Sequence, residues 1–541
     1  MKRYAWAARG DVNAFFGLML DNAAVMVLLV LLITGKDAFD RGFVLSHMIP
    51  ATALGVLFGD LVYTVMAFRL ARRIGRPDVT AMPLGLDTPS TFGIAFLVLL
   101  PTLGQAKTEF KLEPERAMEF AWHVGLVVLV LCGILKVICA PFGNAVRNLI
   151  PRAGLLGSLA AVALVLIAFI PLVDVAEMPV SGLAALTVIL VTLVAHQELP
   201  GRIPGALAAV VIGLVVFHIE TRATTGHHAV LPAIPELGWK GMVLPQFFGE
   251  EPGWWGRVFT IALEKLPVAF PFALATVVGG IDCTESAAAA GDEYDTRTIL
   301  LTEGLAALLA GCLGGVIQTT PYIGHPAYKK MGGRAAYTLA TALCIGAFGL
   351  FGGFDLLQAY IPAPALFPIL VFVGLEISAQ SFQATPTKHY PALALSVMPA
   401  LAALIVLFTK DVFGPTLLPG SERALFKWQT LRCLSNGFIV TSLLWAAALA
   451  MLLDNRARAA AGYLAVAGIC ALFGVIHSPL PDEQIGFPWA IMAKSTGEAK
   501  PFMDAAPYQT PYHWAGAYGI AALLLAVLSL VRPKGFRREA A

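Results

Sequence analysis

The stretch from Gly75 to Pro101, "GRPDVTAMPLGLDTPSTFGIAFLVLLP", contains a contradiction that decides the fold. It is apolar enough to enter a membrane, yet Pro83, Gly85 and Pro89 interrupt it. Proline removes a backbone donor and clashes with the preceding helical turn. Irregular backbone at membrane depth is tolerated only where protein or a water-filled cavity covers it. The stretch therefore predicts a broken membrane span that other helices enclose.

A second stretch repeats this pattern. Residues Gly314 to Tyr337, "GGVIQTTPYIGHPAYKKMGGRAAY", are interrupted by Pro321, Gly324 and Pro326. The first stretch belongs to the third apolar span and the second to the tenth, so the two copies are expected to run in opposite directions. Such a pair, in matching positions of two halves, is the best sequence indication of a transporter's central site. The alternative is two packing kinks, since Gly and Pro are frequent in membrane helices.

The composition places the whole chain in a membrane. Of 541 residues, 58% are hydrophobic and 13% are charged, and the mean hydropathy is +0.75. A soluble protein carries about twice that share of charged residues. The predicted fold class is therefore an all-α polytopic membrane protein. The net charge of +2 gives no reason to expect a nucleic acid partner, and the seven cysteines form no CxxC pair.

Apolar runs predict about sixteen membrane spans of roughly 20 residues each. They cover residues 12–34, 47–70, 80–103, 118–140, 153–173, 181–197, 204–219, 258–288, 298–317, 319–333, 335–353, 360–382, 388–408, 434–453, 460–477 and 513–531.

The positive charges predict an orientation. Lys and Arg clusters, such as the one between residues 69 and 76, follow even-numbered spans throughout the chain. Cytoplasmic loops carry an excess of Lys and Arg, so both termini are expected in the cytoplasm, with the chain in a bacterial inner membrane. The loop 220–256 then lies outside. Its His227–His228 pair is either a solvated loop pair or a metal site.

Two acids in the eighth span require a reason. Asp282 and Glu285 in "VVGGIDCTESAAAAGDEYD" stand three residues apart and share one helix face. A charge at the bilayer centre costs at least about 2.5 kcal/mol, so this face is expected to line a cavity or bind a ligand. Burial favours the protonated form of a carboxyl group, which suits a proton-coupled carrier. The alternative is that the span ends early and leaves both acids at the cytoplasmic interface.

Acids also stand at matching positions of the other half. Asp21 and Asn22 lie in the first span, as Asp282 lies in the eighth. Asp60 in the second span matches Glu303 in the ninth, and we interpret both as structural residues that hydrogen-bond between helices.

These segments resemble the nucleobase–ascorbate transporter family, also called xanthine/uracil permeases, and particularly an uncharacterised bacterial permease branch. The likeness covers roughly residues 12–453. It rests on four segments: "GLMLDNAAVMVLL", "DVTAMPLGLDTPSTFG", "GGIDCTESAAAAG" and "GCLGGVIQTTPYIGHPAYKKMGGRAA".

The resemblance implies two inverted seven-helix repeats that form a core domain and a gate domain, with about two additional C-terminal helices. Residues 12–219 would form the first repeat and 257–453 the second, separated by the extracytoplasmic loop 220–256. Residues 454–541 would add the extra helices and a basic tail. In each repeat the first four helices would belong to the core and the other three to the gate. A homodimer through the gate is a further expectation.

The resemblance also implies a solute site between the third and tenth helices. Asp282 matches the family's ring-binding acid and would also carry the coupling proton. Where the family has an acid after a "TT" motif, this chain has Gly324 with His325 beside it. Tyr322 would stack on a planar ring. The complete predicted site is Asp282, Glu285, Asp87, Thr88, Thr320, Tyr322, Gly324, His325, Asp21 and Asn22.

The predicted function is secondary active transport of a small polar solute, a nucleobase or related planar compound, across the cytoplasmic membrane by alternating access. Related carriers of sulfate and bicarbonate share this fold, so a small anion is the alternative, as is a channel or sensor. No HExxH motif and no GxSxG elbow occurs, so an enzyme is not expected. No cofactor or metal is expected either, and the coupling ion would be H⁺ or Na⁺. The remaining partners are the solute and membrane lipid.

Overall fold

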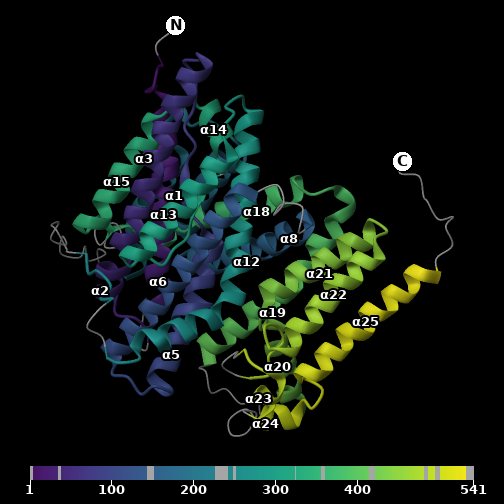
Figure 1. Cartoon of the computed structure of the whole chain (residues 1–541). Helices are drawn as coiled ribbons and strands as arrows, with labels where there is room; N and C mark the ends of the chain where they lie inside the picture. The colour runs from purple at the N-terminus through teal and green to yellow at the C-terminus, as the bar shows by residue number, and fades with distance from the viewer. Residues whose placement is uncertain are drawn as a thin grey trace. The chain divides into compact units, whose positions relative to one another are not determined.

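The computed structural model describes residues 4–34, 38–142, 151–225, 242–247, 251–322, 324–354, 360–413, 421–480, 485–493 and 500–531. The described chain is almost entirely helical (Figure 1). Ten of its helices are long and apolar enough to span a membrane, or up to 12 when two bent pairs are counted. The predicted polytopic all-α fold is therefore confirmed.

The predicted spans correspond to helices, except that each of the two interrupted spans contains a short strand before its helix. Three of them form shorter apolar helices, Pro179–Val194, Ala336–Phe351 and Ala457–Leu472. The expected span at 319–333 is no continuous helix. It consists of a short strand and a short helix, as its prolines and glycine require.

Two matching sets of elements build the predicted core. The first set is α1 (Gly10–Ile33), α3 (Ile49–Ile74), β1 (Leu84–Leu86) with α4 (Thr88–Gly93), and α6 (Pro114–Cys139). The second set is α12 (Trp254–Ala289), α13 (Thr296–Leu313), β2 (Thr319–Pro321) with α14 (His325–Lys330), and α15 (Ala336–Phe351). In both sets the third member is a strand followed by a helix.

The contacts between these elements are symmetric under exchange of the two sets. Helix α3 packs against α15, and α13 packs against α6. Helix α1 contacts α15, β1 and α14, while α12 contacts the equivalent α6, β2 and α4. The strands β1 and β2 pair antiparallel with each other. Figure 1 shows α1, α3 and α15 side by side. The inverted repeat expected from the two interrupted stretches is confirmed in this pattern.

The remaining predicted repeat helices show the same exchange. Helix α10 (Pro179–Ile189) packs on α11 (Gly205–Thr225), and both contact α17 (Ala363–Leu366). Equivalently, α19 (Tyr390–Phe413) packs on α21 (Phe438–Leu453), and both contact α8 (Arg152–Val162). These are the sixth and seventh spans with the twelfth, and the thirteenth and fourteenth spans with the fifth.

The other elements complete the chain. Helix α22 packs against α21 and α25, which places the additional C-terminal helices beside the fourteenth span. The bounds are α2 (Arg41–Phe43), η1 (Val44–Met48), η2 (Ile94–Leu99), α5 (Leu100–Thr108), η3 (Ala140–Phe142), η4 (Ala163–Ala168), α9 (Phe169–Glu177), η5 (Leu190–Val194), η6 (Pro200–Arg202), α18 (Pro368–Gln383), η7 (Thr387–His389), α20 (Glu422–Ser435), α22 (Ala457–Leu472), α23 (Pro488–Ala493), α24 (Lys500–Ala505) and α25 (Pro511–Val531).

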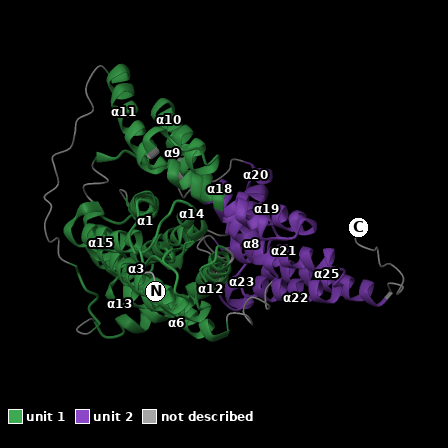
Figure 2. Ribbon diagram, turned by 90° about the horizontal axis from the view of Figure 1, so that it is seen from above, with its two compact units in different colours: residues 1–146, 167–376 green, residues 147–166, 377–541 purple. Residues whose placement is uncertain are grey.

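The chain divides into two compact units, which Figure 2 colours separately. Unit 1 comprises residues 1–146 and 167–376, and unit 2 comprises 147–166 and 377–541. Unit 1 holds both sets of core elements together with α9, α10, α11 and α17, whereas unit 2 holds α8 and α19 to α25. The repeat boundaries predicted from the sequence stay predictions. Most of the loop 220–256, including His227 and His228, lies outside the described residues.

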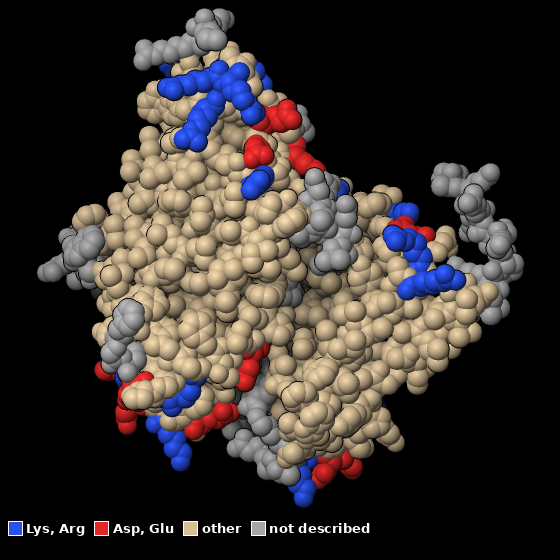
Figure 3. Space-filling view, in the orientation of Figure 1, with Lys and Arg blue, Asp and Glu red and all other residues tan. Residues whose placement is uncertain are grey.

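Charge is distributed unevenly over the surface. Figure 3 shows Lys and Arg gathered at the end of unit 1 where the N-terminus lies, and a broad zone below it almost without charge. Arg69, Arg72 and Arg73, in the last turns of α3, are exposed. An uncharged zone suits contact with lipid, and the basic group at this end agrees with the clustering of Lys and Arg in the sequence. The side of the membrane that this end faces stays a prediction.

A glycine in α3 makes the close approach to β1 possible. A Cβ added at Gly59 would lie 2.2 Å from Cδ2 of Leu84, whereas one added at Gly104 in α5 would meet nothing within 4 Å. Gly59→Ala is expected to lower the free energy of unfolding by about 1–3 kcal/mol, because overpacking forces side chains and backbone to shift. Thermal unfolding in detergent measures this, with Gly104→Ala as the matched control. Equal unfolding temperatures for the two variants would contradict this packing.

Candidate functional site

The two interrupted stretches meet as a two-stranded sheet inside unit 1. Leu84 pairs with Pro321, Gly85 with Thr320, and Leu86 with Thr319. Two further bonds extend the pair: the Asp87 amide donates to the Gln318 carbonyl at 2.8 Å, and the Tyr322 amide donates to the Pro83 carbonyl at 2.9 Å. Because the strands are antiparallel, α4 and α14 leave the sheet at opposite ends. The predicted convergence of the segments around 85–90 and 321–326 is therefore confirmed.

The outer edge of β1 is satisfied by polar side chains from α1 and α3. Oδ1 of Asn22 accepts from the Leu86 amide, and Oδ1 of Asp60 accepts from the Leu84 amide, both at 2.9 Å. Nδ2 of Asn22 also donates to the Leu84 carbonyl at 3.4 Å. Backbone polar groups at membrane depth have no water to bond with. Asn22 and Asp60 therefore replace a third strand.

The outer edge of β2 is satisfied by one side chain from each half. Nζ of Lys136 on α6 donates to the Thr319 carbonyl at 2.9 Å. Sγ of Cys283 on α12 donates to the Pro321 carbonyl at 3.3 Å. Cys283 follows Asp282 just as Asn22 follows Asp21, so the two anchors stand at equivalent positions of the repeats. The predicted substrate-binding residue Asn22 thus serves as a backbone anchor.

A buried ion pair supports the β2 anchor. Nζ of Lys136 lies 2.8 Å from Oε1 of Glu303, and both side chains are fully buried. Glu303 bonds between helices, as the sequence-based interpretation expects, whereas Asp60 bonds to strand β1 instead of to another helix. Sequence analysis missed Lys136. A lone lysine within the apolar run "VLVLCGILKVICAPF" was the available signal, because such a residue is costly without a partner.

Asp21 brings a carboxyl group close to the strand pair. The side chain is 4% exposed, and its Oδ1 has no hydrogen-bond partner among the described residues. A Cβ added at Gly85 would lie 3.9 Å from Oδ2 of Asp21 and 3.6 Å from Cβ of Tyr322. The Tyr322 ring stacks on Tyr328 with centroids 6.1 Å apart. A carboxyl group, a bare stretch of backbone and an aromatic ring therefore lie together.

Other predicted site residues of the two broken spans also lie at the sheet. Oδ2 of Asp87 accepts from the Ser90 amide at 2.8 Å and so caps α4, and Thr88 is buried beside it. Thr320 is half-buried opposite Gly85. Gly324, also half-buried, precedes the first residue of α14. The structure thus brings Asp21, Asn22, Asp87, Thr88, Thr320, Tyr322 and Gly324 to the strand pair or the helix ends next to it.

The two acids of α12 differ in exposure. Asp282 is half-buried, and its neighbour Cys283 places this part of α12 beside β2. Glu285 is exposed. Their predicted roles in solute binding and proton coupling stay predictions.

His325 is engaged in a separate cluster near the ends of α12 and α14. Its Nε2 lies 3.1 Å from the Thr80 carbonyl and 3.4 Å from Oδ2 of Asp292. Asp292, fully buried, also accepts from the Thr80 amide at 3.0 Å and lies 2.5 Å from Nζ of Lys329. Burial by itself would raise the pKa of Asp292, but the bonds from His325, Lys329 and Thr80 hold that pKa below its usual value. The cluster joins the loop before β1 to α14.

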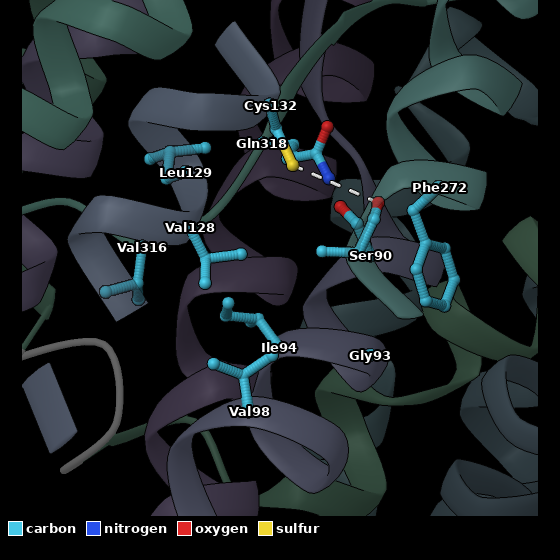
Figure 4. A pocket seen from close by; sticks show the side chains of 11 residues that line it. Ser90, Gly93, Ile94, Val98, Val128, Leu129, Cys132, Phe272, Val316 and Gln318 are labelled. Carbon is cyan, nitrogen blue, oxygen red and sulfur yellow. Dashed lines mark hydrogen bonds between the residues drawn. The ribbon is translucent and has the colours of Figure 1, made fainter. Parts of the chain in front are cut away.

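A small cavity lies within unit 1 beside the N-terminal turn of α4. Figure 4 shows Ser90, Cys132, Gln318 and Phe272 at its walls, contributed by α4, α6, the segment before β2, and α12. Oε1 of Gln318 is buried without a hydrogen-bond partner among the described residues. The cavity has room for about one water molecule. Across the described residues, no group of three His, Cys, Asp or Glu is arranged to hold a metal ion.

No protein-family model and no curated protein matches this chain. It is similar to the solved transmembrane domain of a cyanobacterial bicarbonate transporter, BicA, with 15% identity over 81% of this chain and 97% of that one, at a TM-score of 0.41. Solved SLC26A9 matches with 10% identity over 82% of this chain and 64% of that one, at a TM-score of 0.47.

Murine Slc26a9, an anion transporter solved in the inward-facing state, matches with 13% identity over 77% of this chain and 70% of that one, at a TM-score of 0.44. Similarities at this level concern the course of the chain and carry no information about the substrate. The resemblance to the nucleobase–ascorbate transporter family is therefore not confirmed.

Asp292 provides a test with a defined pH dependence. Asp292→Asn is expected to lower the free energy of unfolding at neutral pH by about 3 kcal/mol, because a buried charge cluster loses its anion. A carboxyl group whose pKa is lowered by folding contributes stability above its unfolded pKa of about 4. That contribution disappears as the pH falls through the lower pKa of the folded state.

Unfolding in detergent over a pH series measures the difference between wild type and Asp292→Asn, which is expected to shrink with acidification. Asp78→Asn is the matched control, because Asp78 is 44% exposed and pairs with the partly exposed Arg76 at 2.7 Å. Its effect is expected to stay below about 1 kcal/mol. A pH-independent effect of Asp292→Asn would contradict the assignment of an ionised Asp292.

Proposed function

We propose that this chain is a secondary active transporter that moves a small polar solute across a membrane by alternating access. The solute binds against the strand pair, facing Gly85, Asp21 and Tyr322. The observation that carries the proposal is the buried Asp21 carboxyl group, which has an unpartnered oxygen beside a glycine backbone and a tyrosine ring. A buried polar atom without a partner is costly. A hydrogen-bonding solute removes this cost when it binds.

The chemistry of these residues favours a planar solute that donates hydrogen bonds, such as a nucleobase. A carboxylate accepts hydrogen bonds from ring N–H groups, and the Tyr322 ring offers a stacking surface. The bare backbone at Gly85 lets a flat ring approach the sheet. Asp282, half-buried on α12, supplies a second carboxyl group near the other strand.

A small anion is the second candidate, and one observation favours it. Helix α4 begins at the strand pair, and helix N-termini attract anions. Two contacts weigh against it. Asp87 already caps α4 with a carboxylate, and the ammonium of Lys136 is engaged by Glu303 and the Thr319 carbonyl. The bicarbonate and anion transporters named above give the anion candidate its concrete probes.

Counterflow in proteoliposomes tests the proposed function. The purified full chain is reconstituted, loaded with unlabelled solute, and given the same solute in labelled form outside. Labelled hypoxanthine probes the nucleobase candidate, and labelled sulfate and bicarbonate probe the anion candidate. A carrier accumulates label transiently for one of these solutes. Equilibration without overshoot identifies a channel, and no flux of any probe contradicts the proposal for these solute classes.

Gly85 offers a substitution that tests the site without disturbing the fold. An alanine methyl there would meet Tyr322 and Asp21 only at ordinary contact distances of 3.6 and 3.9 Å. Gly85→Ala is therefore expected to leave the unfolding temperature nearly unchanged, but to lower solute affinity at least about tenfold, a loss of about 1.4 kcal/mol. Thermal-shift titration with the transported solute measures both quantities. Unchanged affinity would place the solute elsewhere.

The two carboxyl groups distinguish the solute classes. Asp21→Asn and Asp282→Asn are each expected to weaken binding of a solute that donates hydrogen bonds by about 1.5–3 kcal/mol, because a charge-assisted bond is lost. The same variants are expected to strengthen binding of an anion, because a negative charge is removed from the site. Equilibrium binding to the purified variants measures the sign. If neither variant changes affinity, neither carboxyl group contacts the solute.

A further inference from the structure

The buried ion pair behind β2 belongs to a larger group of charges. Lys136 on α6 and Glu303 on α13 are both fully buried and lie 2.8 Å apart. Asp87, the buried cap of α4, is the third member: its amide bonds to the Gln318 carbonyl, and the next carbonyl along β2, that of Thr319, accepts from Lys136. We call these three residues the triad.

The triad is unbalanced in charge. With all three groups ionised, two carboxylates face one ammonium, and one negative charge stays uncompensated. An uncompensated charge away from water costs several kcal/mol. Addition of one proton to either carboxylate leaves one neutral acid and one ion pair, with no net charge. We propose that the triad is a binding site for one exchangeable proton, shared between Asp87 and Glu303.

The surroundings of the triad do not correct this imbalance. Tyr63 on α3 donates to the Ile299 carbonyl, one turn before Glu303 on α13, and Cys283 on α12 donates to the Pro321 carbonyl of β2. Cys132 lies one turn before Lys136 on α6. Tyrosine and cysteine are neutral at physiological pH. The remaining titratable groups are acids, namely Asp60 on α3 and Asp282 beside Cys283. Within the described part of these elements, Lys136 is the positive group that adjoins the triad.

A small, mostly apolar cavity lies beside α4, next to the triad. Ser90 lines it and binds Asp87 through its amide, and Cys132 lines it from the helical turn that precedes Lys136. The buried Oε1 of Gln318, on the same wall, lacks a partner in the described structure (Figure 4). The cavity has room for about one water molecule.

The proton site is mechanically linked to the strand pair. Asp87 directly follows β1 and caps α4, while Lys136 holds the Thr319 carbonyl of β2. Gain or loss of one proton therefore changes contacts at both strands. For its link to transport, this inference rests on the proposed function, and it assigns the coupling proton to the triad in addition to the Asp282 candidate.

Infrared spectroscopy of the purified full chain tests the proton site without any solute. The absorption of protonated carboxyl groups is followed across roughly pH 5 to 9. Glu303→Gln and Asp87→Asn are each expected to remove one titrating carboxyl group, because the remaining acid then forms a balanced pair with Lys136. Lys136→Gln is expected to move the titration to higher pH, since it removes the charge that favours the carboxylate. Asp60→Asn is the matched control and is expected to leave this titration in place.

Two results would overturn the inference. One is a wild-type protein with no titrating protonated carboxyl group. The other is a Glu303→Gln or Asp87→Asn protein that folds and still shows the wild-type titration. Loss of the same titration in Asp60→Asn alone would assign the proton to Asp60 and would equally overturn it.

Transport separates the failure of this inference from failure of the proposed function. In proteoliposomes that show hypoxanthine counterflow, the Glu303→Gln protein is expected to keep exchanging solute. Its uptake driven by a pH gradient is expected to fall at least tenfold. Retention of both activities would overturn the triad as coupling site while the transporter proposal stands. If the infrared titration is as expected but no probe shows flux, the proposed proton site stands and the transporter proposal is contradicted.

Discussion

Extended backbone in a membrane must find a hydrogen-bond partner for every amide and carbonyl, and this constraint organises the centre of the molecule. The strands β1 and β2 satisfy each other along one edge. Their outer edges depend on Asn22 and Asp60 for β1, and on Lys136 and Cys283 for β2. Without these side chains, the irregular backbone would have no stable place at membrane depth. These polar residues of the apolar helices therefore serve to support the two strands.

The buried acidic residues have different roles in this arrangement. Asp60 bonds to backbone, and Glu303 holds the lysine that bonds to backbone. Asp21 has an oxygen left over beside Gly85 and Tyr322, which is the property expected of a ligand-binding group. Asp292 belongs to none of these and fastens the loop before β1 to α14. Structural support and solute binding therefore use neighbouring but different residues.

Much of the fold followed from residue patterns that act locally. Proline and glycine at 83–89 and 321–326 forced broken spans, and their spacing in the series of spans implied inversion. A structural role for Asp60 and Glu303 followed from their matching positions. Pairings between distant segments did not follow, since sequence spacing carries no information about them. Lys136 lies 183 residues from its Thr319 partner, and His325 lies 245 residues from Thr80. His325 was therefore placed in the solute site, although its contacts are with Thr80 and Asp292.

The most direct test of this account is a disulfide between the two strands. Gly85 and Thr320 are cross-strand partners, and partners in an antiparallel pair have Cα atoms about 4.5–5.5 Å apart, within the range of a disulfide. Mild oxidation of the Gly85→Cys/Thr320→Cys protein, followed by peptide mass spectrometry, reports the link, with Gly85→Cys alone as control. The account predicts a peptide joined through positions 85 and 320 in folded, detergent-solubilised protein. Folded protein that fails to form this link would contradict the strand pair and the solute site built on it.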